Sequence, residues 1–147
     1  MLKILNSMAA VAAVALVVSL SGCGGGASDV PDLGQVTGQV TLDGEPLPNA
    51  KVRFQPPDGR SSEGVTNASG EYTLQYNIGL SGAKVGPNDV FITTATEGTL
   101  KTVPGDDDGE WTEGAPELVP AKYLQPGTLT AEVKAGSNTF DFALESK

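Results

Sequence analysis

Hydrophobic and polar residues alternate along most of the chain after Val36, in short blocks separated by residues that favour turns. A period of two places successive side chains on opposite faces of a β-strand, so each block predicts a strand with one apolar face. The predicted inward positions are Val36, Gly38, Val40 and Leu42; Ala50, Val52 and Phe54; Tyr72, Leu74 and Tyr76; Val90, Ile92 and Thr94; Leu129, Ala131 and Val133; and Phe140, Phe142 and Leu144. A further short strand is expected around Val65. The pattern therefore predicts a fold that is almost entirely β.

Turn residues end these blocks at regular intervals, notably Asp43-Gly44, Pro56–Gly59 and Asn67–Gly70. Seven or so short strands with one apolar face are typical of two antiparallel sheets packed face to face. We therefore expect residues 35–147 to form a seven- to eight-stranded antiparallel β-sandwich, the architecture that immunoglobulin-like domains have. The single cysteine precedes this region, so the sandwich must be stabilised by apolar burial without a disulfide.

The first 22 residues have the organisation of a secretory signal peptide. Lys3 is followed by an apolar stretch from about Met8 to Leu20 that is too short for a membrane-spanning helix. The sequence Leu20–Cys23 resembles the bacterial lipoprotein box, which implies cleavage between Gly22 and Cys23 and attachment of lipid, such as palmitate, to Cys23. The alternative is a buried apolar cysteine after an ordinary helix, followed by three glycines.

The lipoprotein resemblance implies a location and a domain order. The protein would be membrane-anchored on the extracytoplasmic side of a bacterial cell envelope, at either the inner or the outer membrane. Residues 23–34 are rich in glycine and lack an apolar period, so they predict a lipidated flexible tether in front of the sandwich.

Composition excludes several functions. The chain carries 9 basic and 18 acidic residues, a formal charge of −9, and the basic residues are scattered, so nucleic acid is not an expected partner. The chain contains no histidine, which excludes imidazole acid–base chemistry and His-Cys zinc sites. With Cys23 acylated there is no free thiol nucleophile. We expect no enzyme activity, no catalytic residue, no cofactor and no metal site.

Residues 98–117 form the longest stretch without a strand pattern, and a loop of about twenty residues in a compact domain is usually functional or disordered. The candidate ligand residues are Asp106, Asp107, Asp108, Glu110 and Trp111, with Glu113 and Glu117 nearby. Clustered carboxylates can bind calcium, although the spacing is not that of an EF-hand, and a solvated charged loop is the simpler interpretation. Trp111 is suited to stack on a sugar, to anchor a protein partner, or to pack the loop onto the sandwich.

Two segments resemble the carboxypeptidase regulatory-like domain. Leu42–Phe54 is similar to its first signature and Thr66–Leu74 to its second, and the carboxyl-terminal stretch is similar to the ending of small bacterial lipoproteins built on this domain. The resemblance implies a transthyretin-like sandwich in which Gly44 and Gly70 form turns and Tyr72 anchors the core. Gly86–Val90 departs from the pattern, because an aromatic residue is expected soon after the glycine.

These observations favour a lipid-anchored, non-catalytic cell-envelope module for structural or protein–protein interaction. Its expected partners are the membrane, through the lipid, and an envelope protein or glycan. The alternative is a carbohydrate- or calcium-binding module that uses the 98–117 loop.

Overall fold

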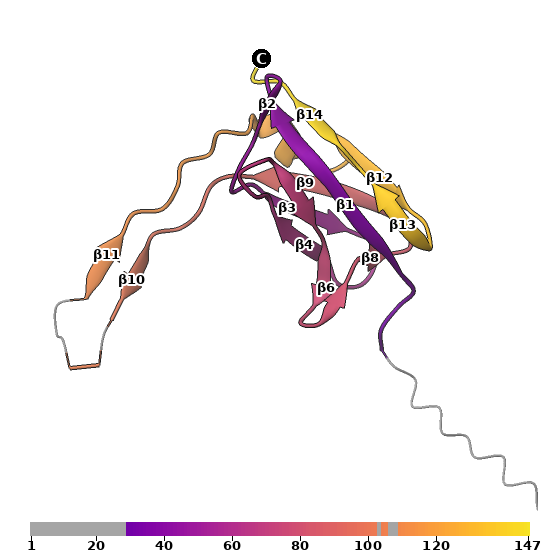
Figure 1. The fold of residues 1–147 in the computed structure, drawn as a ribbon, viewed down its shortest axis with the longest axis horizontal. Coiled ribbons are helices and arrows are strands. Elements are labelled where there is room, and N and C mark those ends of the chain that lie inside the picture. The colour runs from indigo at the N-terminus through magenta and orange to yellow at the C-terminus, as the bar shows by residue number, and fades with distance from the viewer. Residues whose placement is uncertain (1–28, 103, 106–108) are drawn as a thin grey trace, which may run out of the picture.

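The computed structural model describes residues 29–102, 104–105 and 109–147, which form a β-sandwich with a long hairpin projecting from it (Figure 1). The strands are β1 (Leu33–Leu42), β2 (Glu45–Pro46), β3 (Lys51–Gln55), β4 (Ser62–Val65), β5 (Glu71–Thr73), β6 (Gln75–Asn77), β7 (Leu80–Ser81), β8 (Ala83–Lys84), β9 (Gly86–Thr93), β10 (Thr99–Lys101), β11 (Glu110–Thr112), β12 (Leu129–Val133), β13 (Gly136–Thr139) and β14 (Phe142–Leu144). A short 3-10 helix, η1, spans Ala121–Leu124. Within the described ranges, no helix has the length and apolar character needed to cross a membrane. Gly22, Cys23, Asp106, Asp107 and Asp108 lie outside the described residues.

The long strand β1 organises the first sheet. On one side it pairs antiparallel with β2, β5 and β8, and on the other side it pairs in parallel with β13 and β14. The parallel pairs differ from the expected purely antiparallel arrangement. The chain reaches β13 from β12, which belongs to the other sheet, and a connection between sheets does not impose the antiparallel direction that a hairpin does.

The second sheet has the strand order β12-β9-β3-β4-β6-β7, and its pairs are antiparallel. β3 and β4 lie at its centre, and β9 lies between β3 and the edge strand β12. β9 begins at Gly86, four residues before Val90. The segment Gly86–Val90, which departs from the pattern of the carboxypeptidase regulatory-like domain, is therefore part of this strand.

The two sheets enclose the predicted core. The fully buried side chains include Val36, Val40, Val52, Phe54, Leu74, Val90, Ile92, Val133 and Leu144. Phe142 is partly buried at the edge of this core, with its ring centroid 6.2 Å from that of Phe54 and 6.4 Å from that of Tyr72. The Tyr72 hydroxyl donates a hydrogen bond of 2.7 Å to the Phe140 carbonyl, and burial raises the Tyr72 pKa. The all-β sandwich and the inward faces of its main strands are thus confirmed.

Two blocks differ in detail from the expectation. The predicted strand from Glu71 to Tyr76 is shared between the sheets, as β5 in the first and β6 in the second, and it changes sheet at Leu74. In β4, Val65 faces outward and is 59% exposed, while Ser62 is buried. Thr66, directly after β4, is also buried. The alternation of apolar and polar residues marks only apolar side chains as buried, so it did not predict the burial of the Ser62 and Thr66 hydroxyl side chains.

Candidate functional site

The stretch from 98 to 117 is not the loop without strands that the sequence predicted. It belongs to a hairpin, called here the arm (residues 94–118), that leaves the end of β9 and extends away from the sandwich (Figure 1). β10 and β11 pair antiparallel within it. Because the arm has solvent on both sides, its residues lack the alternation that burial of one face imposes on the other strands.

Backbone contacts continue between the two halves of the arm towards the sandwich. The Thr96 amide donates to the Ala115 carbonyl at 3.0 Å, and the Ala115 amide donates to the Thr96 Oγ1 at 2.8 Å. Gly114 is required for this close approach, because a Cβ at that position would overlap the Thr96 carbonyl oxygen. These contacts join the halves of the arm well below its outer end.

The Glu117 carboxylate fastens the base of the arm to β9. It accepts hydrogen bonds from the Thr93 hydroxyl, from the Thr94 amide at 2.9 Å and from the Val119 amide at 3.0 Å. Burial opposes its ionisation, but these hydrogen bonds outweigh that effect and hold the Glu117 pKa below its ordinary value. Glu117, which the sequence placed beside the acidic cluster, is therefore a structural residue.

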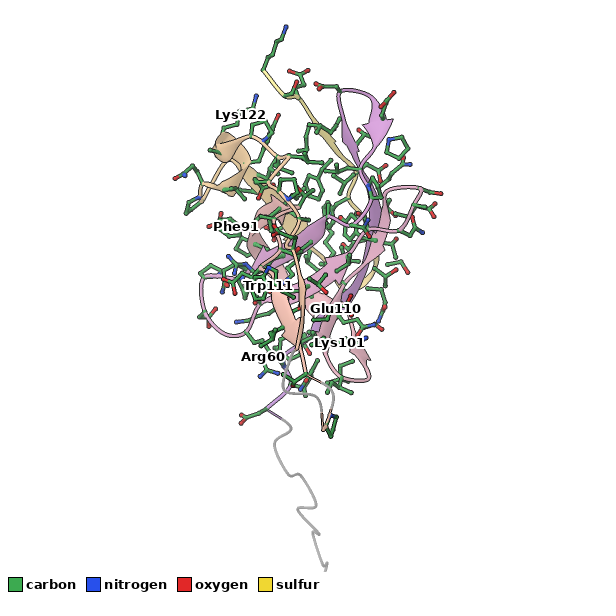
Figure 2. All side chains as sticks on the ribbon, turned by 90° about the vertical axis from the view of Figure 1, so that its left-hand side faces the viewer. Arg60, Phe91, Lys101, Glu110, Trp111 and Lys122 are labelled. Carbon is green, nitrogen blue, oxygen red and sulfur yellow. The ribbon has the colours of Figure 1, made fainter. Side chains whose placement is uncertain are left out.

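The outer part of the arm has two different faces. Leu100 and Trp111 lie directly opposite each other, so their side chains share one face. Lys101 and Glu110 form the next pair, on the other face, and Figure 2 shows both on the other side of the arm from Trp111. Leu100 is 57% exposed and Trp111 is 59% exposed. The Trp111 ring lies over Gly98, where an added Cβ would lie 2.9 Å from the Trp111 Cε2. Trp111 therefore packs within the arm and leaves most of its surface to solvent, so of the three uses considered for it, packing the loop onto the sandwich is not the one seen.

Among the described residues, the carboxylates form no metal-binding cluster beside Trp111. Glu110 belongs to the opposite face of the hairpin, and in residues 29–102, 104–105 and 109–147 no three Cys, His, Asp or Glu side chains lie close enough to hold a metal ion. Asp106, Asp107 and Asp108 lie outside this description. The structure thus pairs Trp111 with Leu100, a residue that the sequence had not marked. The Pro104-Gly105 pair midway between Leu100 and Trp111 was the available signal, because such a pair indicates a turn between two strands.

Comparisons with known proteins do not assign this chain to a family. No protein-family model matches the chain, and no curated protein matches it. Among solved structures it is similar to a DUF3823 family protein from Parabacteroides merdae ATCC 43184, with a TM-score of 0.37 and 13% identity over 79% of this chain and 46% of that one. It is also similar to a 9R-lipoxygenase from Cyanothece PCC8801, with a TM-score of 0.38 and 18% identity over 78% of this chain and 16% of that one.

The chain spans less than half the length of either of these structures. Similarity at this level assigns neither a family nor an activity. The lipoprotein signature and the carboxypeptidase regulatory-like resemblance thus stay predictions from the sequence.

Proposed function

We propose that this protein is a lipid-anchored, non-catalytic module of the bacterial cell envelope, and that its sandwich holds out the arm as a contact surface for a protein partner. The observation that carries the proposal is the pair Leu100 and Trp111, which lies exposed on one face of a hydrogen-bonded hairpin away from the sandwich.

The chemistry of the arm is suited to binding a protein. Tryptophan is enriched among the residues that contribute most to interface affinity, because it buries a large surface with few rotatable bonds. Glu117 fixes the base of the arm, so less conformational entropy is lost when a partner binds its outer end. The described part of the arm presents two exposed apolar side chains, Leu100 and Trp111, which are suited to burial in a protein interface.

The membrane anchor rests on the sequence around Cys23. A thiol at the end of Leu-Ser-Gly-Cys would receive the lipid, and the glycine-rich segment after it would let the sandwich stand clear of the headgroups. Cys23→Ala removes the acceptor thiol, so we expect no incorporation of labelled fatty acid. Equal labelling of the variant would contradict the anchor.

The arm is tested by placing a photo-crosslinking amino acid at Trp111, with Thr112 as the matched control. Thr112 is the next residue along β11 and faces the other side of the hairpin. In intact cells we expect protein adducts from position 111 and few from position 112. Equal adducts at both positions, or none at 111, would contradict the proposal.

Glycan binding is the second candidate, and the exposed indole of Trp111 favours it because sugars stack on aromatic faces. A thermal-shift screen with envelope glycans would detect it, since a ligand at one hundred times its Kd stabilises the folded state by about 2.7 kcal/mol. Calcium belongs in the same screen, with sodium at matched ionic strength as its control. We expect calcium to raise the melting temperature no more than sodium does, because the spacing of the acidic residues is not that of an EF-hand and either salt screens the repulsion between carboxylates.

A further inference from the structure

The outer face of the second sheet carries a groove with two cations. Lys51 and Arg53 of β3 lie beside Thr93 and Phe91 of β9, and Leu124 of η1 completes the wall of a recess of about 330 Å³. The Arg53 guanidinium lies 4.9 Å from the centre of the Phe91 ring. These residues define the β3–β9 groove.

The groove continues into an apolar recess at the base of the arm. This basal recess measures about 390 Å³, shares Lys51 and Thr93 with the β3–β9 groove, and is lined by Val65, Ala95 and Ala115. Val65 is an aliphatic side chain on the outer face of β4 and is 59% exposed. An apolar pocket therefore lies next to a pair of positive charges.

The arm has the complementary chemistry. Residues 94–118 contain seven of the chain's 18 carboxylates and a single lysine, so the arm is its most acidic segment. Glu113 directly follows β11, and continuing the alternation of that strand by one residue places it on the Trp111 side of the arm. In the β3–β9 groove, Glu63 is the one carboxylate among the lining residues. An apolar ring with an adjacent carboxylate thus matches an apolar recess with adjacent cations.

A molecule's own arm does not fill its own groove. Trp111 pairs with Leu100, six residues beyond Thr94, which places the ring about 20 Å along the arm at 3.3 Å per residue. The basal recess lies at the start of the arm, and the arm extends away from the sandwich (Figure 1). The groove and the ring are therefore free to meet between molecules.

From this complementarity we propose that two copies of the chain exchange arms, with the Leu100 and Trp111 face of each arm lying in the β3–β9 groove and basal recess of the other. This inference rests on the proposed function and names its partner as a second copy. A twofold arrangement forms the contact twice. If each arm buries roughly 300 Å² and covers as much on its partner, two contacts bury roughly 1,200 Å². That area is at the lower limit for a specific dimer, so we expect association in the micromolar range.

Sedimentation of charge-reversed variants tests the exchange. The groove variant is Lys51→Glu with Arg53→Glu, and the arm variant is Glu113→Lys, on the Trp111 side of the arm. Each alone places like charges in contact, and we expect at least about a tenfold loss of self-association. An equimolar mixture should associate again, because each variant then offers the charge that the other's groove or arm requires. Lys134→Glu with Lys147→Glu is the control, since it matches the groove variant's charge change outside the groove.

The outcomes separate this inference from the function on which it rests. Restored association in the mixture supports arm exchange, and two variants that stay monomeric when mixed, while melting at the wild-type temperature, contradict it. If the wild type is monomeric throughout the micromolar range and the crosslinker at Trp111 captures a different protein, the exchange is wrong and the proposed function stands. A monomer that captures nothing overturns both. Flotation with lipid vesicles that depends on Trp111 would also contradict the exchange.

Discussion

Replacement of Glu117 by alanine should loosen the base of the arm and destabilise the sandwich. The substitution leaves the amides of Thr94 and Val119 without their acceptor, and these two residues are only 5% and 3% exposed. A buried amide without a partner costs about 1–3 kcal/mol. The Glu117 side chain lies at the surface, so water can replace part of the lost hydrogen bonding. We therefore expect the free energy of unfolding to fall by about 1–3 kcal/mol in total, and not by that amount for each of the two amides.

Urea unfolding followed by circular dichroism measures this loss, with Glu97→Ala as the control because Glu97 is an exposed carboxylate on the same arm. For a domain of this size the melting temperature should fall by roughly 5–10 °C. Equal midpoints for Glu117→Ala and the wild type would show that the carboxylate does not fasten the arm.

The pH dependence of Glu117→Gln provides an independent test. Because the folded-state pKa of Glu117 is lowered, its ionised form stabilises the fold above the ordinary carboxyl pKa, and this contribution is lost as the pH falls through the folded-state value. The wild type should therefore exceed the Gln variant in stability at neutral pH, and the difference should shrink on acidification. A difference that grows as the pH falls would refute the assignment.

Three further substitutions test the sandwich by urea unfolding. Thr66→Val should cost about 1–3 kcal/mol, because the Thr66 hydroxyl bridges the backbone carbonyl of Leu47 and the backbone amide of Ala50, both buried residues, and an unchanged midpoint would show that the bridge is dispensable. Tyr72→Phe should cost about 1 kcal/mol by leaving the Phe140 carbonyl without its donor, and a gain in stability would contradict this role. Phe142→Ala should cost about 3 kcal/mol, the lower end for a buried phenylalanine, because Phe142 is only partly buried. A cost below about 1 kcal/mol would mean that its ring does not belong to the core.

The parts of the fold that could be predicted from sequence are those in which burial controls residue choice. Val52 and Phe54 alternate with Lys51 and Arg53 because β3 has one face in the core and one in solvent. The parallel partners of β1 could not be predicted in this way, because alternation reports which face is buried and says nothing of strand direction. Direction depends on where the chain crosses between sheets.

The stretch 98–117, the candidate site from the sequence, has a different form in the structure from the one expected. Trp111 and Glu110 belong to the hairpin, but neither strand of the arm is buried on one face, so no alternation marked it. Glu117 is a second example. A carboxylate that accepts backbone hydrogen bonds has the same sequence signature as a solvated one, and only the fold places the amides of Thr94 and Val119 around it.

The energetics of the arm favour a role outside the sandwich. A two-stranded hairpin is marginally stable in water by itself, and this one relies on the Thr96 to Ala115 contacts and on Glu117 at its base. Leu100 and Trp111 lie beyond these contacts and are not part of the core cluster, so burial in the sandwich does not account for either side chain. Exposing them in a strongly acidic segment keeps the free arm soluble, while a surface that supplies both an apolar recess and positive charge can bury them. The β3–β9 groove and the basal recess of a second molecule supply the positive charge and the apolar surface, which is why we consider the arm and this surface to be two halves of one interface.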